Sequence, residues 1–400
     1  MKRLIAFIIC IAIMVVPVSA AVSMEYNATD LDVPLEKDSV QTSATVGAPD
    51  IKAQAAILME VQTGQILWEN NSDEQLAPAS ITKIMALLLV MEAINDGSLT
   101  LDTVIAASEH ACSMGGSQIW LEPGEQMTVD ELLRAAVIAS ANDATVALGE
   151  QLAGSEEGFV ALMNERAKEL GMNNTNFINC TGLDAEGHLT TAHDVAIMSR
   201  ELIKHDLIKQ YSTVWMDSLR SGESELVNTN KLVRFYEGCT GLKTGTTSTA
   251  GYCLSATAER DGMELVAVVM NGETSSDRFE GAKKLLNYGY ANYSFSEIEA
   301  DLGDKSTIKV NKGVADSIAL QTTEKLKLLL PKTAKGEITE TITLPESIDA
   351  PVKKGDKIGT VTFVSGDETL GAVDIVAKED VDRLNITHTL LWLLRALFSL

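Results

Sequence analysis

The chain has 400 residues and is strongly acidic: 56 Asp and Glu against 32 Lys and Arg give a formal net charge of −24 at pH 7. This length exceeds one average domain and is enough to bury a sizeable core. Proteins that bind nucleic acid carry a basic footprint, so we expect no nucleic-acid partner. The five histidines are scattered, with no H-E-x-x-H or C-x-x-C spacing, so we expect neither a metal site nor a cofactor.

The N-terminus has the pattern of an export signal. A basic pair at residues 2–3 precedes an apolar stretch over residues 4–16, and residues 18–20 have the small side chains of a cleavage site. The apolar stretch is shorter than the roughly 20 residues that a bilayer span needs. We therefore predict a signal peptide over residues 1–20, with an uncleaved anchor as the alternative. The polar, acidic residues 21–50 are predicted to form a flexible leader.

Residues 51–294 show strand patterns, then helical patterns, then strand patterns again. A short turn containing Gly64 lies between two alternating segments, which predicts a β-hairpin. Residues 139–143 are predicted to form a loop between two helices. The predicted strands are 55–60, 65–69, 238–246, 251–258 and 265–271, and the predicted helices are 129–138, 144–152, 159–170, 191–204 and 277–293.

The sequence pattern changes after residue 294. Short β-patterned segments at 306–310, 337–344 and 360–364, with turn glycines between them, predict a smaller all-β domain over residues 295–381. Residues 383–400 place leucines on one side of a helical wheel and polar side chains on the other. This stretch is short for a membrane span, so we predict an amphipathic helix that anchors the chain to a membrane surface. A helix packed on the protein's own body is the alternative.

The most informative stretch begins at Ser80, where an apolar run of helical character starts just after Pro78. Lys83 follows three residues later, so a helix places its amine on the same face as the serine hydroxyl. The residues behind the pair are apolar almost all round, which predicts a buried helix. A serine beside a desolvated amine can act as a nucleophile without a histidine. The spacing alone is weak evidence, because Ser306 and Lys309 repeat it on an alternating segment where the two side chains point to opposite faces.

Two tripeptides strengthen the first match. Ser140-Ala141-Asn142 lies between two predicted helices, Lys243-Thr244-Gly245 lies on a predicted strand, and each pattern occurs once in the chain. S-x-x-K, S-x-N and K-T-G in this order and at wide spacing are a known signature of serine acyl-transfer enzymes.

On these motifs the chain resembles the low-molecular-mass penicillin-binding proteins, the serine-type D-alanyl-D-alanine carboxypeptidases. The resemblance covers nearly the whole chain. It implies an α/β (α+β) penicillin-recognising serine-transferase fold: an antiparallel sheet flanked by helices, with a helical subdomain, over residues 51–294, followed by the smaller all-β domain. Further matching stretches are residues 78–83, Ser140-Ala141-Asn142-Asp143-Ala144, Thr181-Gly182-Leu183-Asp184 and residues 241–247.

The same resemblance implies the activity and its setting. The chain is expected to remove the terminal D-alanine from peptidoglycan stem pentapeptides and to be inhibited by β-lactams. It is expected to be exported and to work at the extracytoplasmic face of the cell membrane, held there by its C-terminal helix.

The mechanism that the resemblance implies starts at Ser80, which attacks the carbonyl of the D-Ala-D-Ala bond and holds the acyl group until water releases it. Lys83 has to be neutral to accept the serine proton, although a free lysine has a pKa near ~10.4. Burial and the positive charge of Lys243 are expected to lower that pKa. Ser140 is expected to pass the proton to the leaving amine, and Asn142 to orient Lys83 and the substrate amide.

Substrate binding is expected along the strand that carries Lys243 and Gly245, which would pair edge-on with the substrate backbone. Thr244 would lie at the terminal carboxylate, where Lys243 supplies positive charge. The backbone N–H groups of Ser80 and Thr246 would form the oxyanion hole, and each such donor stabilises the transition state by on the order of 3 kcal/mol. Related enzymes vary at the position of Thr246, where some have histidine, so we expect a modest effect on rate or pH dependence.

Other functions remain open at this stage. A class A-like β-lactamase needs a glutamate that activates water, and the candidates are predicted to lie on solvated helix faces: Glu150, Glu156, Glu165 and Glu169. A DD-endopeptidase or a weak transpeptidase would carry the same motifs, whereas a non-catalytic protein that binds muropeptides or β-lactams would usually have lost one. The absence of G-x-S-x-G disfavours a Ser-His-Asp hydrolase. The four cysteines after the signal can be free thiols or disulfides.

Overall fold

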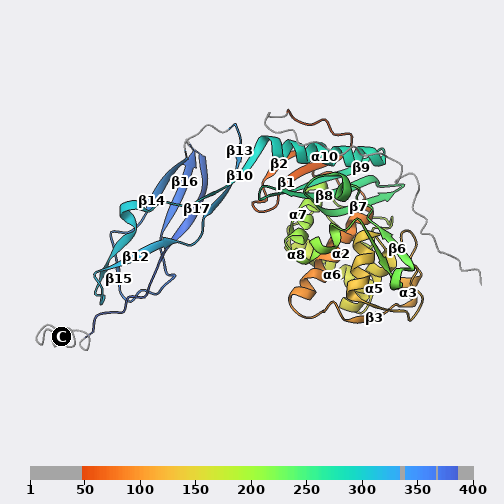
Figure 1. The fold of residues 1–400 in the computed structure, drawn as a ribbon, viewed down its shortest axis with the longest axis horizontal. Helices are drawn as coiled ribbons and strands as arrows, with labels where there is room; N and C mark the ends of the chain where they lie inside the picture. The colour runs from red at the N-terminus through yellow and green to blue at the C-terminus, as the bar shows by residue number, and fades with distance from the viewer. Residues whose placement is uncertain (1–46, 334–337, 366–367, 386–400) are drawn as a thin grey trace, which may run out of the picture.

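The computed structural model describes residues 47–333, 338–365 and 368–385. The predicted signal peptide, most of the predicted leader and residues 386–400 of the predicted tail helix lie outside these residues. Figure 1 shows two parts side by side, one with a sheet and the helices and one built mainly of strands.

The first part is organised around a five-stranded antiparallel sheet in the order β2-β1-β9-β8-β7, with β7 at one edge. β1 and β9 pair along their lengths, so the beginning and the end of this part are hydrogen-bonded neighbours. Both strands are buried at nearly every position because helices cover both faces of the sheet. The strands are β1 (Ala55–Glu60), β2 (Ile66–Asn70), β7 (Cys239–Thr247), β8 (Gly251–Arg260) and β9 (Met263–Gly272).

The helices cover the sheet with two separate apolar clusters. α10 packs on one face, where Phe279 and Leu285 are fully buried. α2 and α7 pack on the other face within the larger cluster, together with the helices of the subdomain. The helices are α2 (Lys83–Asn95), α3 (Glu109–Cys112), α4 (Val129–Ile138), α5 (Asn142–Ala153), α6 (Glu156–Glu169), α7 (Ala192–Ile203), α8 (Asp206–Ser212), α9 (Leu232–Phe235) and α10 (Ser275–Asn292), with 3-10 turns η1 (Ala79–Thr82) and η2 (Arg220–Gly222).

Local sequence explains where several of these helices begin. Thr128 accepts a hydrogen bond from the backbone N–H of Glu131, and the Glu131 carboxylate accepts from the backbone N–H of Thr128. Thr274 and Asp277 form the same capping box before α10. Such boxes satisfy backbone donors that have no partner within the helix.

The predicted strands and helices of this part are present, with shifted ends. The predicted helix 129–138 coincides with α4. α5 already begins at Asn142, so the loop predicted over 139–143 is shorter than expected. Two antiparallel pairs of short strands were missed because strands of three or four residues are too short to show alternation. They are β3 (Val104–Ala106) with β4 (Gln126–Thr128), and β5 (Met216–Leu219) with β6 (Ser224–Val227).

The second part confirms the predicted all-β domain. It contains a six-stranded sheet in the order β14-β16-β17-β12-β11-β15 and a separate pair of strands, β10 and β13. Its core includes Val361, Phe363 and Ile375, which are fully buried. The strands are β10 (Tyr293–Ile298), β11 (Thr307–Asn311), β12 (Ser317–Thr322), β13 (Leu326–Pro331), β14 (Ile338–Thr343), β15 (Ser347–Asp349), β16 (Lys357–Ser365) and β17 (Glu368–Ala377), with a 3-10 turn η3 (Gly303–Lys305).

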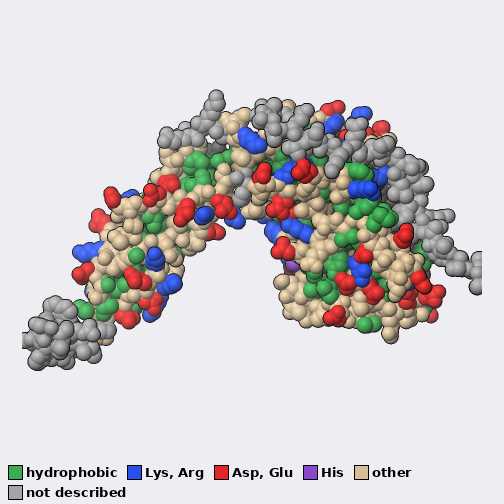
Figure 2. All heavy atoms as spheres, viewed as in Figure 1, with side chains coloured by type: hydrophobic (Ala, Val, Ile, Leu, Met, Phe, Trp, Pro, Cys, Tyr) green, Lys and Arg blue, Asp and Glu red, His purple; other side chains and the backbone are tan. Residues whose placement is uncertain are grey.

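The two parts are joined through β10 and β13. Leu329 of β13 is buried in the same cluster as α10, and the backbone N–H of Lys332 donates to Asn292 O at 2.7 Å. Figure 2 shows that the parts touch at one end and leave an open space between them on the lower side. Across the described ranges, no helix is long and apolar enough to span a membrane.

Candidate active site

Ser80 lies in η1, a turn of 3-10 helix that leads directly into α2. The expectation of α-helix from Ser80 onward is therefore wrong by one turn, since α2 starts at Lys83. Residues i and i+3 of a 3-10 helix lie above one another because the helix has three residues per turn. The two side chains meet as expected, with Lys83 Nζ 3.0 Å from Ser80 Oγ.

Lys83 is fully buried, and three oxygen atoms surround its amine. Nζ lies 2.5 Å from Asn142 Oδ1, 2.8 Å from the carbonyl oxygen of Thr181 and 3.0 Å from Ser80 Oγ. Burial lowers the pKa of Lys83 to about 7. A neutral amine has two hydrogens and one lone pair, and carbonyl oxygens can only accept. The Asn142 and Thr181 oxygens therefore take both hydrogens, and the lone pair is left for the Ser80 hydroxyl.

The S-x-N tripeptide reaches the site at the start of α5. Asn142 Nδ2 donates to Gly115 O at 2.6 Å, which orients the amide so that its oxygen faces Lys83. Ser140 has a φ of +63°, a value that few residues other than glycine adopt and that is often found at functional sites. Through this turn Ser140 contacts Lys243 while Asn142 contacts Lys83.

Lys243 lies on the edge strand β7 and is 1% exposed. Its Nζ donates to Ser140 Oγ at 2.8 Å and to Thr244 O at 3.0 Å. Burial and the positive charges of Lys83 and Arg278 lower the pKa of Lys243 well below its ordinary value. Sequence analysis attributed part of the Lys83 shift to Lys243. Burial is the largest cause of the lowered pKa of each lysine, and repulsion between the two amines disfavours protonation of both at once.

The hydroxyl groups on either side of Gly245 have side-chain partners from other elements. Thr244 Oγ1 donates to Thr229 Oγ1 at 2.7 Å. Thr246 is exposed, and its Oγ1 accepts from Arg278 Nη1 at 2.8 Å. Thr229 and Arg278 could not be recognised in the sequence, because neither belongs to a known motif.

Gly245 packs directly against the turn that carries the serine. A Cβ at this position would lie 3.0 Å from Ala79 Cβ and 3.0 Å from Ser80 N. A glycine therefore lets the edge of the sheet approach η1 closely, and Ser80 lies beside the middle of the K-T-G segment.

Two further residues build the site although sequence analysis gave them no role. The Asp143 carboxylate is buried, and its Oδ2 accepts from the backbone N–H groups of Ile119 and Leu121, at 3.1 Å each. It thereby ties the loop before β4 to the start of α5. Thr181 contributes only its backbone oxygen to Lys83, which a side-chain motif cannot reveal.

The expectation that Glu156 lies on a solvated face is wrong. Its side chain is 13% exposed, Oε1 accepts from the backbone N–H of Cys180 at 3.1 Å, and Oε2 lies 2.7 Å from His110 Nε2. Glu156 thus anchors the residue next to Thr181. Glu150 is partly buried, and Glu165 and Glu169 are exposed.

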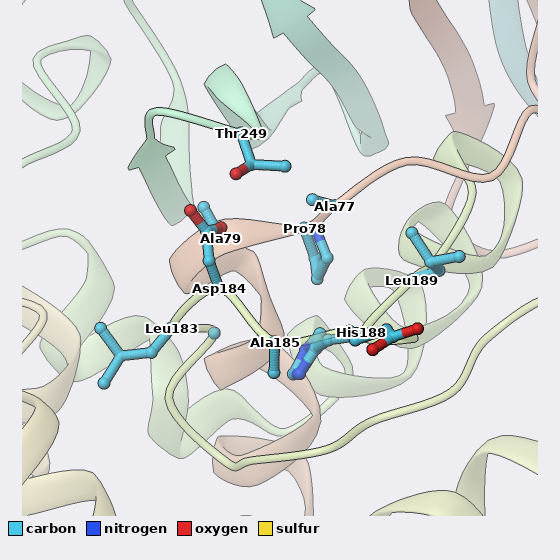
Figure 3. Close-up of a pocket in the computed structure, with 11 residues that line it drawn as sticks. Ala77, Pro78, Ala79, Leu183, Asp184, Ala185, His188, Leu189 and Thr249 are labelled. Atoms are coloured by element: carbon cyan, nitrogen blue, oxygen red, sulfur yellow. The ribbon is translucent and has the colours of Figure 1, made fainter.

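A cavity of about 340 Å³ is lined by Ala79, the residue before the nucleophile in η1 (Figure 3). Residues 77–79 form one wall, and the loop from Gly182 to Leu189 forms the other, with Thr249 near the end of β7. Thr247 Oγ1 donates to Asp184 Oδ1 at 2.7 Å, which links the end of β7 to that loop.

Cys112, Cys180, Cys239 and Cys253 are free thiols, and Cys180 and Cys253 are buried. The part of the chain that the structure describes contains no group of three His, Cys, Asp or Glu side chains placed to hold a metal ion.

A serine paired with a low-pKa lysine, next to a second serine–lysine pair on the edge of an antiparallel sheet, defines a serine-type acyl-transfer hydrolase. Residues 42–274 match the family model described as D-alanyl-D-alanine carboxypeptidase, and residues 301–383 match that of the penicillin-binding protein 5 C-terminal domain. The chain belongs to the D-alanyl-D-alanine carboxypeptidase family, whose members are serine-type hydrolases.

Individual relatives agree with the family model. The chain is 43% identical to D-alanyl-D-alanine carboxypeptidase DacF of Bacillus subtilis over 83% of this chain and 86% of the relative. Penicillin-binding protein 5 from Haemophilus influenzae has a similar solved structure, with a TM-score of 0.73, 30% identity, and coverage of 84% of this chain and 100% of that one. The predicted family, fold class and enzyme class are thus confirmed, and the alternative functions are not favoured.

Proposed function

We propose that the chain removes the terminal D-alanine from peptidoglycan stem pentapeptides through an acyl-enzyme on Ser80. One observation carries the proposal: the buried amine of Lys83 has two acceptor-only oxygens and one hydroxyl, that of Ser80, within hydrogen-bond distance. Neutral Lys83 takes the Ser80 proton while Oγ bonds to the carbonyl carbon of the penultimate D-alanine.

The leaving amine needs a proton when the C–N bond breaks. Ser140 can donate this proton, because its hydroxyl contacts Lys243 and can be reprotonated from there. The same turn carries Asn142, which contacts Lys83, so Ser140 also lies close to the first lysine. Ser140 then recovers a proton from the lysine pair, so that Lys83 is neutral again. Water attacks the ester, with Lys83 as its base, and releases the shortened peptide.

Binding is proposed to follow the edge strand. The substrate backbone pairs with β7 along Thr244, Gly245 and Thr246, and the terminal carboxylate lies at Thr244 and Lys243, where it favours the charged form of Lys243. The close packing of Gly245 on η1 supports an oxyanion hole from the N–H groups of Ser80 and Thr246. Each such donor is expected to contribute on the order of 3 kcal/mol.

D-alanine release from diacetyl-L-Lys-D-Ala-D-Ala tests the proposal. The wild-type protein should release D-alanine and become labelled by fluorescent penicillin, whereas Ser80→Ala should do neither. Labelling without D-alanine release would reject the carboxypeptidase assignment, and labelling of Ser80→Ala would reject the nucleophile.

β-Lactams are proposed as inhibitors that acylate the same serine. A solved structure of penicillin-binding protein D2 from Listeria monocytogenes in its ampicillin-bound form supports this proposal, with 32% identity, a TM-score of 0.55, and coverage of 60% of this chain and 100% of that one.

The organisation around the catalytic domain is also proposed. We infer domain limits of 1–20, 21–50, 51–294, 295–381 and 383–400, in the order signal, leader, catalytic domain, β-rich domain and amphipathic membrane helix. We also propose an extracytoplasmic location, because the substrate is part of peptidoglycan, and attachment at the face of the cell membrane through residues 383–400. Deleting residues 383–400 should release the protein from membranes without lowering D-alanine release, and continued membrane association would point to the N-terminal segment instead.

A further inference from the structure

The cavity in Figure 3 lies next to η1, the turn that carries Ser80, because Ala79 of that turn lines it. β7 runs from Lys243, past Gly245 beside Ser80, to Thr247, which contacts Asp184. Residues in a strand advance about 3.3 Å each, so Thr247 is about 7 Å beyond Gly245. An extended peptide whose acyl carbon is on Ser80 therefore has its preceding residue abreast of Thr247, at the mouth of the cavity.

Charge determines which end of the substrate points to the cavity. Lys243 lies at one end of this strand segment, where its charged form attracts the terminal carboxylate. Asp184 and Glu186, both exposed, line the cavity at the other end. The acyl part of the substrate therefore runs from Ser80 towards these two carboxylates.

The other cavity-lining residues leave that negative charge uncompensated. His188 is the only basic residue among the lining residues, all of which the structure describes, and burial lowers its pKa to about 4. Its ring nitrogens are also engaged elsewhere, with Thr82 Oγ1 at 2.9 Å and the N–H of Ile178 at 3.2 Å. Figure 3 shows the side chain of Asp184 near Ala79 and that of His188 near Ala185, apart from each other.

We propose that this cavity is the subsite for the stem-peptide residue that precedes the penultimate D-alanine, and that Asp184 and Glu186 favour a positively charged amine on its side chain. The inference rests on the proposed carboxypeptidase function and names the substrate class that this function selects. The wall formed by residues 77–79 would contact the apolar stem of the side chain, while the carboxylates contact its amine.

Two peptides that differ by one acetyl group test the inference. Nα-acetyl-L-Lys-D-Ala-D-Ala keeps the side-chain amine, and the Nα,Nε-diacetyl peptide has lost its charge. At low ionic strength we expect kcat/KM for D-alanine release to be about tenfold higher for the free amine, as two partly exposed ion pairs can supply. The preference should fall as salt is added.

Variants distinguish an effect of these two carboxylates from an effect of the protein's overall negative charge. In the double variant Asp184→Asn, Glu186→Gln, the ratio of the two kcat/KM values should fall to about 1, and Glu186→Gln alone should give about threefold. Asn at 184 retains an oxygen that can accept from Thr247. Glu165→Gln removes one charge from an exposed position on α6 and should keep the full preference. Glu186→Lys leaves one negative and one positive charge at the cavity, so it should also bring the ratio to about 1.

Equal wild-type rates on the two peptides, or a full preference in the double variant, would overturn the inference while leaving the carboxypeptidase function intact. Release from neither peptide would instead reject the proposed function. Penicillin labelling of each variant verifies that its serine site is folded.

Discussion

At the scale of single residues, Lys83 depends on burial for its chemistry. An exposed lysine is protonated at neutral pH and cannot accept a proton. Complete burial removes the water that stabilises the charge, and two carbonyl oxygens then orient the neutral amine. Lys83 can therefore accept a proton, and the lone pair of its amine is held pointing towards Ser80.

The rate of Ser80 acylation should follow this ionisation. Because the neutral form of Lys83 is the reactive one, the second-order rate of penicillin labelling should rise with pH through about 7 and level off above it. Asn142→Asp puts a carboxylate next to Nζ, which favours protonated Lys83, so the rise should move to higher pH by about one unit or more. Stopped-flow labelling between pH 5 and 10 measures both profiles, and coincident profiles would contradict this role of Lys83.

His188 should make the fold sensitive to acid. The Ile178 N–H donates to Nδ1, so the proton is on Nε2, which donates to Thr82 Oγ1. Burial lowers the folded-state pKa to about 4, whereas the unfolded chain binds the proton below about 6.5. The stability that neutral His188 contributes is thus full above pH 6.5 and is lost between pH 6.5 and 4.

His188→Gln tests this linkage, because glutamine keeps one donor and one acceptor and does not titrate. The free energy of unfolding from urea titrations should fall by about 3 kcal/mol less in the variant than in the wild type between pH 7.5 and 4. The measurement at pH 7.5, where both side chains are neutral, is the internal control. Parallel losses in the two proteins would refute the assignment.

At the scale of elements, the turn η1 that carries Ser80 packs against two neighbouring segments, β7 and the loop at Thr181. Both neighbours approach η1 through a glycine. Gly245 allows the sheet edge to reach Ser80, and Gly182, with a φ of +86°, allows the loop to reach Ala79. The positions of these two backbones determine where the catalytic oxygens and N–H groups lie.

Gly182→Ala should therefore have two effects: it strains the backbone at a positive φ, and it displaces the active site by steric clash. An added Cβ would lie 1.8 Å from Ala79 O and 2.9 Å from Ser80 N, so η1 or the loop must move. We expect penicillin acylation to slow by about 100-fold or more, as misplaced catalytic groups usually do. Gly124→Ala is the matched control, because its φ is +80° and it has no atom within 4 Å. It should lose stability but keep its acylation rate, and an equal loss of rate in both variants would reject the steric explanation.

At the scale of the whole molecule, the β-rich part is bound to the catalytic part by more than a linker. β13 pairs with β10, which follows α10 directly, and Leu329 of β13 is buried with the residues under α10. A strand of the second part thus completes an apolar cluster of the first. The two parts should therefore depend on each other for stability at this junction.

Two leucines of similar burial distinguish the junction from the interior of the β-rich part. Leu329 and Leu320 are each 6% exposed, but they belong to different clusters. Either change to alanine should cost about 2 to 5 kcal/mol of local stability. Leu329→Ala should lower the melting temperature at which penicillin labelling is lost, and Leu320→Ala should leave it unchanged. Equal effects of the two substitutions would mean that the parts unfold as one unit.

Much of the fold was predictable because its signals are local. Each of these signals lies within a few neighbouring residues. Examples are the apolar run after Ser80, the capping residue Thr128 before α4 and the apolar patterns of β1 and β9. The three motifs also identified the serine, both lysines, Ser140 and Asn142 as one site. Short strands such as β3 and β4 lacked a periodic signal and were missed.

The amino-acid sequence by itself determined which residue types carry the chemistry and which segments are helix or strand, since both depend on near neighbours along the chain. Only the tertiary structure decided what surrounds Lys83. The Thr181 carbonyl lies 98 positions away in sequence, and the Asn142 amide is oriented by Gly115. Such contacts depend on how buried elements pack, and a backbone oxygen is the same in every residue. The structure therefore shows why Lys83 can be neutral and where the cavity next to η1 lies.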